Sequence, residues 1–391
     1  MKIALLARSV HPLHGHGGLE RHVAALKLYL ILAGCDVRLF TCPPLNPSFS
    51  MNDNTDVFVP YQTVPLPRAK GFVIVDRNTN YLLWSLRAAR KLFRSFEPDV
   101  VQADGGAGFG YAFCGKKDSA PLVLHPHGME EFKTTRLKHM AYWPLRKATR
   151  YAAKRAACVI APDAGMEEEV QQNLGVPKAK ICTIPNAIDL ELIDRTREPI
   201  SLASYGIKGN EKVLLSVGRL EENKGFADLV HALSRVQEKV KVDWRWVLVG
   251  AGPKYHSLAR VIQRSAIQDR VCMTGSLSDQ QLFALYDRAD LFVHPTRYEG
   301  SSMVTLEAMS HRTAVIGTRV GGIPDKIRDG ASGRLVPPKD VGALVQAIVD
   351  SISNPEILLK WGMEGRRIVE EKFSWQQRTE ELLGLYEKII R

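Results

Sequence analysis

The chain has 391 residues, more than one hydrophobic core usually supports, so two domains are expected. With 45% hydrophobic and 24% charged residues, its composition excludes a disordered or fibrous protein. The net charge of +11 is uneven: residues 1–185 hold 24 Lys and Arg against 15 Asp and Glu, and residues 186–391 hold 29 against 27. An anionic partner is therefore expected for the N-terminal half.

The N-terminal segment Met1–Arg8 reads as a first β-strand, because Arg8 interrupts the apolar run that a signal peptide needs. No apolar run approaches the roughly 20 residues that span a bilayer. Six cysteines are scattered without a CxxC pair, which argues against a zinc site or a disulfide framework and fits a reducing cytosol. A cytoplasmic protein is predicted, with contact to the inner face of a membrane as an extension of that prediction.

In residues 1–185, short apolar strands alternate with helical patterns, which is typical of a parallel sheet covered on both faces. A long irregular insertion is expected at Asn46–Lys70, which is rich in Pro, Asn and Thr. The predicted strands are Lys2–Leu6, Val37–Thr41, Val100–Ala103, Leu122–His125, Cys158–Ala161 and Ile181–Ile184, and the helices include Leu19–Ala33, Tyr81–Phe96 and Tyr142–Ala157.

The alternation restarts after a polar, proline-bounded linker, Pro185–Pro199, and an amphipathic helix is predicted at Trp375–Ile390. We therefore predict two α/β domains, which comprise residues 1–185 and 186–374. Ligands of open α/β sheets bind at the carboxyl ends of the strands, so we expect a cleft between the halves. The predicted strands of the second half are Lys212–Ser216, Trp246–Val249, Val271–Met273, Leu291–Val293 and Ala314–Ile316.

Two loops of the first half follow predicted strands. The first carries Gly17 and Gly18 and lacks the third glycine of the dinucleotide-binding fingerprint, which disfavours NAD, although its N–H groups suit a phosphate. The second contains His127, placed to hold a sugar hydroxyl or to lie beside a reacting carbon. A lone histidine is more often structural, and only its position favours function here.

Two loops of the second half suit a diphosphate. The segment Gly218–Gly225 places Arg219 and Lys224 near a helix N-terminus, where two cations and the helix dipole favour an anion. A glycine-rich turn at Gly250 and Gly252 follows the next strand, and it is equally explained as a tight turn.

The segment His294–Met309 carries two carboxylates eight positions apart, Glu299 and Glu307, which flank the start of a helix. Gly300, Ser301 and Ser302 supply its N-terminus. We expect Glu307 about two turns into the helix, on the order of 10 Å from its start. One carboxylate would bind sugar hydroxyls and the other a ribose diol, as in a nucleotide sugar. Solvated helix charges are the alternative interpretation.

The basic stretch Lys133–Arg155 contains no acidic residue and includes Tyr142 and Trp143. It favours an anionic membrane surface or a lipid-linked substrate slightly over a solvated helix face. No nucleic-acid-binding module is recognised. An Asp-x-Asp motif is also absent from the sequence, so we predict no metal at the diphosphate, whose charge would be neutralised by Arg219, Lys224 and helix N-termini.

In combination and order, these motifs resemble the retaining glycosyltransferases of the GT-B group, family 4 type (glycosyl transferases group 1), with the Glu-x7-Glu signature at Glu299 and Glu307. The resemblance spans nearly the whole chain. It is carried by Gly17-Gly18, His127, Gly218-Arg219 with Lys224-Gly225, Gly250-x-Gly252, Gly275, the Glu-x7-Glu segment and Val320-Gly-Gly-Ile-Pro324.

The resemblance implies two Rossmann-like domains facing a central cleft. The N-terminal one would bind the acceptor and be joined by the last helix, 375–391, and the C-terminal one would bind the donor. Arg219 and Lys224 would hold the diphosphate, Glu299 the sugar, and Glu307 the ribose. His127 would lie near the anomeric centre, although His-Gly stands here where relatives often have His-Asp.

The implied activity is metal-independent, retaining hexosyl transfer (EC 2.4 class) to a glycan or lipid-linked acceptor, in cell-envelope polysaccharide or lipopolysaccharide synthesis. No cofactor is expected beyond the nucleotide-sugar co-substrate, with a UDP-sugar favoured over a GDP-sugar. Two alternatives remain: a nucleotide-sugar epimerase of the same architecture, which needs no acceptor, and a non-catalytic nucleotide-sugar-binding protein.

Overall fold

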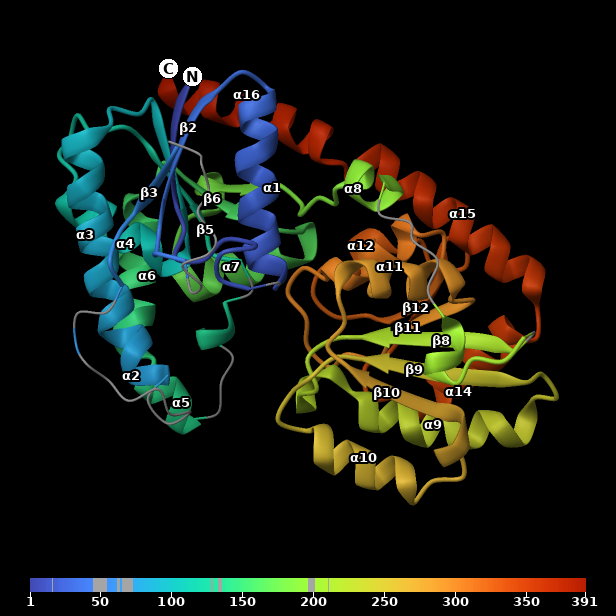
Figure 1. Cartoon of the computed structure of the whole chain (residues 1–391). Coiled ribbons are helices and arrows are strands. Elements are labelled where there is room, and N and C mark those ends of the chain that lie inside the picture. The colour runs from blue at the N-terminus through green and yellow to red at the C-terminus, as the bar shows by residue number, and fades with distance from the viewer. Residues whose placement is uncertain are drawn as a thin grey trace. The chain divides into compact units, whose positions relative to one another are not determined.

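A computed structural model of the chain divides into two compact units (Figure 1). Unit 1 comprises Met1–Asn186 together with Trp375–Arg391, and unit 2 comprises Ala187–Ser374. The structure describes residues 1–15, 17–44, 55–61, 64, 73–127, 129–132, 136–195, 201–209 and 211–391, with the backbone alone at 130 and 136–138.

Unit 1 is built on a seven-stranded parallel sheet of order β3-β2-β1-β4-β5-β6-β7. The strand order changes direction beside β1, so β1 and β4 are neighbours although β2 and β3 separate them in sequence. The strands are β1 (Lys2–Leu6), β2 (Asp36–Thr41), β3 (Asp56–Phe58), β4 (Val100–Asp104), β5 (Leu122–His125), β6 (Cys158–Ala161) and β7 (Ile181–Thr183).

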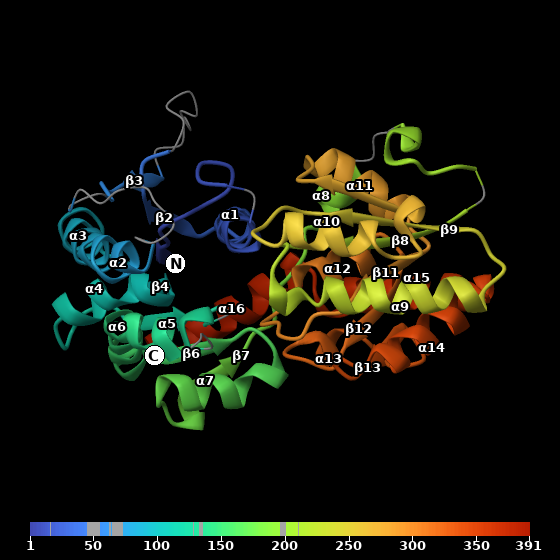
Figure 2. The same ribbon diagram turned by 90° about the horizontal axis from the view of Figure 1, so that it is seen from below.

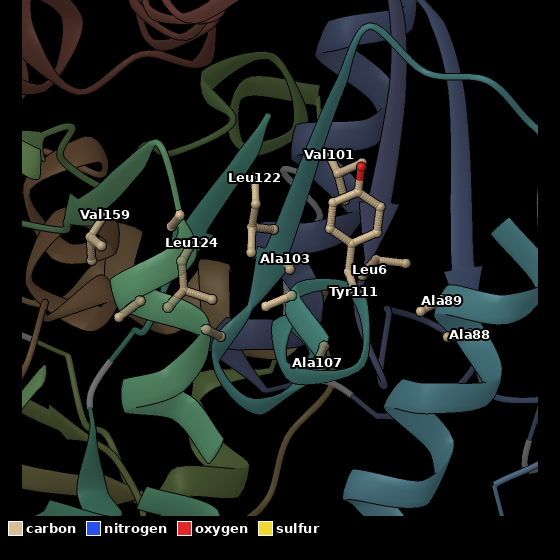
Figure 3. Packing of buried hydrophobic residues seen from close by; sticks show 14 of the residues in the cluster. Leu6, Ala88, Ala89, Val101, Ala103, Ala107, Tyr111, Leu122, Leu124 and Val159 are labelled. Carbon is tan, nitrogen blue, oxygen red and sulfur yellow. The ribbon is translucent and has the colours of Figure 1, made fainter. Parts of the chain in front are cut away.

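Both faces of this sheet are buried. On one face, small residues such as Ala103 and Ala107 let helices approach closely, and Leu124 and Tyr111 fill the remaining space (Figure 3). On the other face, α1 packs beside α16, where Tyr29 stacks on Trp375 at 5.9 Å between ring centroids. The helices of unit 1 are α1 (Gly18–Leu32), α2 (Val73–Asn78), α3 (Asn80–Ser95), α4 (Gly108–Cys114), α5 (Arg136–Ala141), α6 (Trp143–Arg155), α7 (Glu167–Leu174) and α16 (Trp375–Ile390).

Unit 2 is built on a six-stranded parallel sheet of order β10-β9-β8-β11-β12-β13. Its helices lie on both sides of the sheet (Figure 2). The strands are β8 (Lys212–Val217), β9 (Trp244–Val249), β10 (Val271–Gly275), β11 (Leu291–His294), β12 (Ala314–Thr318) and β13 (Gly333–Val336). The helices are α8 (Leu190–Arg195), α9 (Phe226–Lys239), α10 (Tyr255–Gln263), α11 (Asp279–Arg288), α12 (Met303–Ser310), α13 (Ile323–Lys326), α14 (Val341–Ile352) and α15 (Pro355–Lys372).

The strands of unit 2 are apolar at successive positions because each face supplies a separate core. Leu214 points into one core with α9 and α14, and Leu215 into the other with α11 and α12. The predicted α/β class with parallel sheets is therefore confirmed. The predicted cleft between the halves stays a prediction.

Three connecting segments contain an element that was not predicted. The insertion Asn46–Lys70 is not irregular throughout, because β3 lies within it; its residues 46–54, 62–63 and 65–70 fall outside the described chain. The linker Pro185–Pro199 holds the boundary between the two units, after Asn186, and α8 lies within it; β13 was not predicted. Both missed strands are edge strands paired on one side only, and such strands are short and less apolar.

Across the described residues, no helix is both long enough and apolar enough to span a lipid bilayer. All six cysteines carry free thiols.

Candidate functional site

Three of the predicted loops lie side by side in unit 2. They follow β8, β9 and β11, and these strands are neighbours in the sheet. Backbone hydrogen bonds join the first two loops, from Gly218 N–H to the Val249 carbonyl at 3.0 Å and from Leu220 N–H to the Ala251 carbonyl at 3.0 Å. The carboxyl ends of three parallel strands thus gather the Arg219–Lys224, Gly250–Gly252 and Glu299–Ser302 segments at one edge.

The glycines of the second loop are required by this close packing. A Cβ at Gly250 would lie 1.9 Å from the Gly218 carbonyl oxygen, and Gly250 has φ +142°. A Cβ at Gly252 would lie 2.5 Å from the Leu220 carbonyl oxygen. Because backbone fills the space that a side chain would need, these two glycines let the β8 and β9 loops meet.

Glu299 is the centre of the polar contacts in unit 2. Its Oε2 accepts a hydrogen bond from Lys224 Nζ at 2.6 Å and another from His294 Nε2 at 3.1 Å. His294 ends β11 and its ring is buried, whereas Glu299 and Lys224 each keep about a sixth of the side chain exposed, 16% and 17%. The carboxylate is held on one oxygen by two donors, one at the end of β11 and one in the loop after β8.

The protonation of this group is set by those donors. Burial alone would raise the pKa of Glu299, but the hydrogen bond from His294 and the charge of Lys224 outweigh it and lower the pKa to about 2. Burial is also the main reason why the pKa of His294 lies below its usual value. Glu299 is therefore a carboxylate at neutral pH, held ready to accept hydrogen bonds.

A second set of contacts fixes the two loops to each other. Thr296 Oγ1 donates to the Asn223 carbonyl at 3.0 Å, and Arg297 forms a two-pronged ion pair with Asp228 at 2.7 and 2.9 Å. A Cβ at Gly225, where φ is +69°, would lie 2.0 Å from the Pro295 carbonyl oxygen. These contacts hold Lys224 against Glu299.

Arg219, the other predicted cation, is placed differently. Its side chain is 67% exposed and pairs with Glu221 at 2.7 Å. An exposed ion pair of this kind contributes little to stability and is easily exchanged for another anion. The two cations are near each other in sequence, but only Lys224 contacts Glu299.

The start of α12 is built by Gly300, Ser301 and Ser302, as predicted. The Ser302 hydroxyl accepts from Thr305 N–H at 3.4 Å and caps the helix. The Ser301 hydroxyl contacts Lys326 Nζ at 3.2 Å. The Gly300 carbonyl accepts from Gly322 N–H at 2.9 Å, so the loop after β12 supports this helix start from behind.

Glu307 lies closer to the helix start than predicted. It is the fifth residue of α12, about one turn or roughly 6 Å from the first residue, and the expected two turns were wrong. The helix begins at Met303 because Ser302 caps it, later than the sequence suggested. Glu307 is 8% exposed, and its Oε2 accepts a hydrogen bond from the Tyr286 hydroxyl at 3.1 Å.

In unit 1, His127 follows β5 in the left-handed region, with φ +54°. This conformation is uncommon for a non-glycine residue and is concentrated at functional sites. His127 Nε2 lies 2.9 Å from Asp104 Oδ1, at the end of the neighbouring strand β4. Gly17 caps α1 and Gly18 is its first residue, both exposed.

The basic stretch Lys133–Arg155 divides into buried and exposed residues. The side chains of 133–138 lie outside the described chain. Arg146 is buried, which contradicts the view of one continuous solvated face, and Tyr142 is buried as well. Exposed side chains of α6 include Trp143, at 58%, and Lys147, whose Nζ lies 5.7 Å from the Trp143 ring centroid.

Sequence reasoning identified Glu299 and Lys224 but missed the residues that position them. His294 ends an apolar strand five positions before Glu299, a signal that was available. Arg297 and Tyr286 gave no comparable signal, because their partners Asp228 and Glu307 lie 69 and 21 positions away. The roles assigned to the predicted residues stay predictions.

Two family models together match most of the chain. The one described as Glycosyltransferase Family 4 matches residues 16–192, and the one described as Glycosyl transferases group 1 matches residues 198–368.

Individual relatives have low sequence identity to this chain, but the similarity covers most of both chains. The chain is 25% identical over 317 residues to alpha-D-kanosaminyltransferase from Streptomyces kanamyceticus, covering 79% of this chain and 82% of the relative. Its structure is similar to sucrose-phosphate synthase from Thermosynechococcus elongatus, with a TM-score of 0.81, 22% identity, and 99% and 98% of the two chains covered. It is also similar to HepE from Anabaena in complex with UDP, with a TM-score of 0.77, 18% identity, and 99% and 100% covered.

Proposed function

Because this chain belongs to the GT-B glycosyltransferases of the family 4 type, we propose that it moves a hexosyl group, with retention, from a nucleotide-sugar donor to a hydroxyl of a glycan or lipid-linked acceptor. The observation that carries the proposal is the Glu299 carboxylate, held by Lys224 and His294 where the loops after β8, β9 and β11 meet. It is anionic, partly accessible, and surrounded by donors suited to a sugar and a diphosphate.

In this proposal, unit 2 binds the donor. Lys224 and Arg219 neutralise the diphosphate, with backbone N–H groups at Gly300–Ser302. Glu299 accepts hydrogen bonds from sugar hydroxyls, and Glu307 from the ribose diol. A UDP-sugar is favoured over a GDP-sugar, and the similar Anabaena protein in complex with UDP supports this choice.

Donor binding requires an exchange of partners at Lys224. Its Nζ now lies 2.6 Å from Glu299 Oε2. A diphosphate oxygen takes over part of the contact with Lys224. The sugar hydroxyls then donate hydrogen bonds to Glu299 in place of the Lys224 ammonium group. The exposed Arg219–Glu221 pair opens for the same reason, at small cost. The free site is thus internally neutralised until the donor replaces its ion pairs.

The transfer step breaks the bond between the anomeric carbon and the diphosphate oxygen and forms a bond from that carbon to the acceptor oxygen. The acceptor proton passes to an oxygen of the departing diphosphate, on the face that the leaving group vacates. Lys224 and Arg219 stabilise the negative charge that develops there. No metal ion and no protein nucleophile are required in this scheme.

For the acceptor, we propose a lipid-linked or lipopolysaccharide-type glycan at an anionic membrane surface. Trp143 and Met140 are exposed at 58% and 68%, and Lys147 Nζ lies 5.7 Å from the Trp143 ring centroid. Exposed aromatic and basic side chains of this kind bind the interface of anionic bilayers. Sedimentation with phosphatidylserine vesicles at low salt, weakened in Trp143→Ser, supports this acceptor class; equal sedimentation of both proteins with neutral vesicles contradicts it.

The test of the donor site is a thermal-shift panel of UDP, GDP, ADP and their sugar conjugates, with and without EDTA. We expect a shift with one nucleotide that EDTA does not change and that Lys224→Ala removes. Radiolabelled donor then distinguishes the alternatives: release of nucleotide with sugar on an acceptor supports the transferase. Conversion of the sugar without acceptor identifies an epimerase, and binding without turnover identifies a binding protein.

A further inference from the structure

The end of the unit 1 sheet gathers a cluster of metal-binding side chains. Asp104 and His125 are paired in register as the last residues of β4 and β5, so their side chains leave the sheet on the same side. His127 follows two positions later. We call Asp104, His125 and His127 the histidine cluster. Its three potential ligand atoms all lie within 4.8 Å of one another.

The polar atoms of this cluster are incompletely satisfied. His127 Nε2 contacts Asp104 Oδ1 at 2.9 Å. His125 is 2% exposed, and neither of its ring nitrogens has a hydrogen-bond partner among the residues that the structure describes. A buried imidazole without any partner is costly, so each such group calls for an unseen ligand or water.

The surroundings keep His125 and the adjacent His22 uncharged. Burial, followed by the nearby His127, lowers the pKa of His125, and burial lowers the pKa of the adjacent His22 to about 3. Rings of His22 and Trp375 close one side, with 5.0 Å between the His22 and His125 centroids and 5.1 Å between His22 and Trp375. The neutral imidazole is the form that binds metal ions.

We propose that the histidine cluster binds one divalent transition-metal ion of the Zn²⁺ type through Asp104 Oδ1 and one nitrogen each of His125 and His127. Two imidazoles and a carboxylate are a ligand set that zinc accepts, with a fourth position left open. Bond lengths of about 2.0–2.1 Å separate tetrahedral ligand atoms by roughly 3.4 Å, so side-chain movements of up to about 1.4 Å close the site. His127 keeps 18% of its side chain exposed, which gives the ion a route in.

Metal binding changes the contact that now joins His127 to Asp104. The Nε2 proton that His127 shares with Asp104 moves to Nδ1 when Nε2 becomes the ligand. This inference goes beyond the proposed function, in which Lys224 and Arg219, and no metal, neutralise the diphosphate. Since the family resemblance places His127 near the anomeric centre of the reacting sugar, an ion on this ring inhibits transfer, and the metal-stripped enzyme is the active form.

The experiment uses the full chain without a histidine tag, stripped with EDTA and then dialysed. Titration with Co²⁺ followed by visible absorption, and competition by Zn²⁺, measure binding without donor or acceptor. We expect one equivalent of metal, and at least about tenfold weaker binding in Asp104→Asn and His125→Phe. His256→Ala, which removes an exposed histidine of unit 2, is the matched control and keeps wild-type affinity.

Two outcomes overturn the proposal: no stoichiometric binding by the wild type, or equal binding by the wild type and both cluster variants. Circular dichroism checks that the variants are folded. If a variant does not fold, X-ray absorption of the Zn²⁺-loaded wild type decides: two imidazoles with a carboxylate support the site, and sulfur ligands overturn it. The donor thermal shift needs no metal, so failure of one proposal leaves the other standing.

Discussion

Glu299 of unit 2 and His125 of unit 1 differ in how their polar atoms are satisfied. In unit 2, Glu299 is a charged group whose donors, Lys224 and His294, are both in place. In unit 1, His125 is an uncharged ring with no hydrogen-bond partner among the described residues. Both groups lie at the carboxyl ends of parallel strands, on closely similar sheets.

This contrast determines which kind of ligand suits each unit. A satisfied ion pair must exchange partners when a ligand arrives, so unit 2 selects ligands that supply both an anion and hydroxyls. An unsatisfied imidazole gains a partner on binding and loses none, so unit 1 favours a ligand that brings a vacant coordination position. Substitutions in the two units should therefore have different effects, of which the loss of the Lys224 cation is the largest.

Replacing Lys224 with Ala should reduce the transfer rate by about 10²–10³-fold, because it removes the cation nearest the developing diphosphate charge. Initial rates at saturating donor and acceptor measure the effect. Lys239→Ala, an exposed lysine at the far end of α9, is the control and should retain the wild-type rate. Equal rates for both variants would show that Lys224 does not act on the diphosphate.

Acidification should destabilise the wild type more than Glu299→Gln. The pKa of Glu299 is lowered from 4.5 to about 2, so its carboxylate contributes stability above pH 4.5 and this contribution is lost as the pH falls towards 2. The contribution is at most about 3 kcal/mol. Urea unfolding between pH 5 and pH 2 measures it, and parallel pH profiles for the two proteins would contradict the assignment.

Gly321→Ala should lower the free energy of unfolding by about 2 kcal/mol and slow transfer. Gly321 has φ +52°, and a Cβ there would lie 2.0 Å from the Glu299 carbonyl oxygen, so the loop that carries the carboxylate must shift. Gly384→Ala in α16 is the control: no atom lies within 4 Å, and a helical alanine should stabilise by up to about 1 kcal/mol. Urea titrations report both values.

The smallest effect distinguishes two of the buried histidines, His125 of unit 1 and His294 of unit 2. In the presence of EDTA, His125→Phe should raise the free energy of unfolding by about 1 kcal/mol, because it removes unpaired polar atoms. His294→Phe should lower it, because Glu299 then loses a donor. Urea unfolding measures both changes in the free energy of unfolding. Changes of opposite sign would support the contrast between the two units, and a loss of stability in both variants would contradict it.

Much of the fold was predictable because the apolar runs in the sequence coincide with the buried central strands. β1, β5 and β6 have the predicted bounds, since runs such as Leu122–His125 are buried on both faces. The edge strands β3 and β13 were missed, because a strand with one neighbour needs less apolar sequence. Glu299 and Lys224 were found from their own loops, 75 positions apart.

The remaining contacts depend on tertiary structure. Nothing in the sequence relates Asp104 to His125 until the register of β4 and β5 is known. The same holds for Tyr286 and Glu307, which come from different helices. A local pattern identifies a loop, whereas the sheet order decides which loops meet.

The position of the last helix in the sequence decides the order in which the two units can complete their folding during synthesis. Unit 1 contains Trp375–Arg391, and the fully buried Tyr386 donates its hydroxyl to Gln102 on β4. Unit 2 is continuous and can complete its core while the chain is still emerging from the ribosome. Unit 1 begins first and finishes last, so its sheet must wait through the synthesis of about 190 further residues for α16 to cover it. During that interval the exposed face of its sheet is the part of the nascent chain most in need of a chaperone.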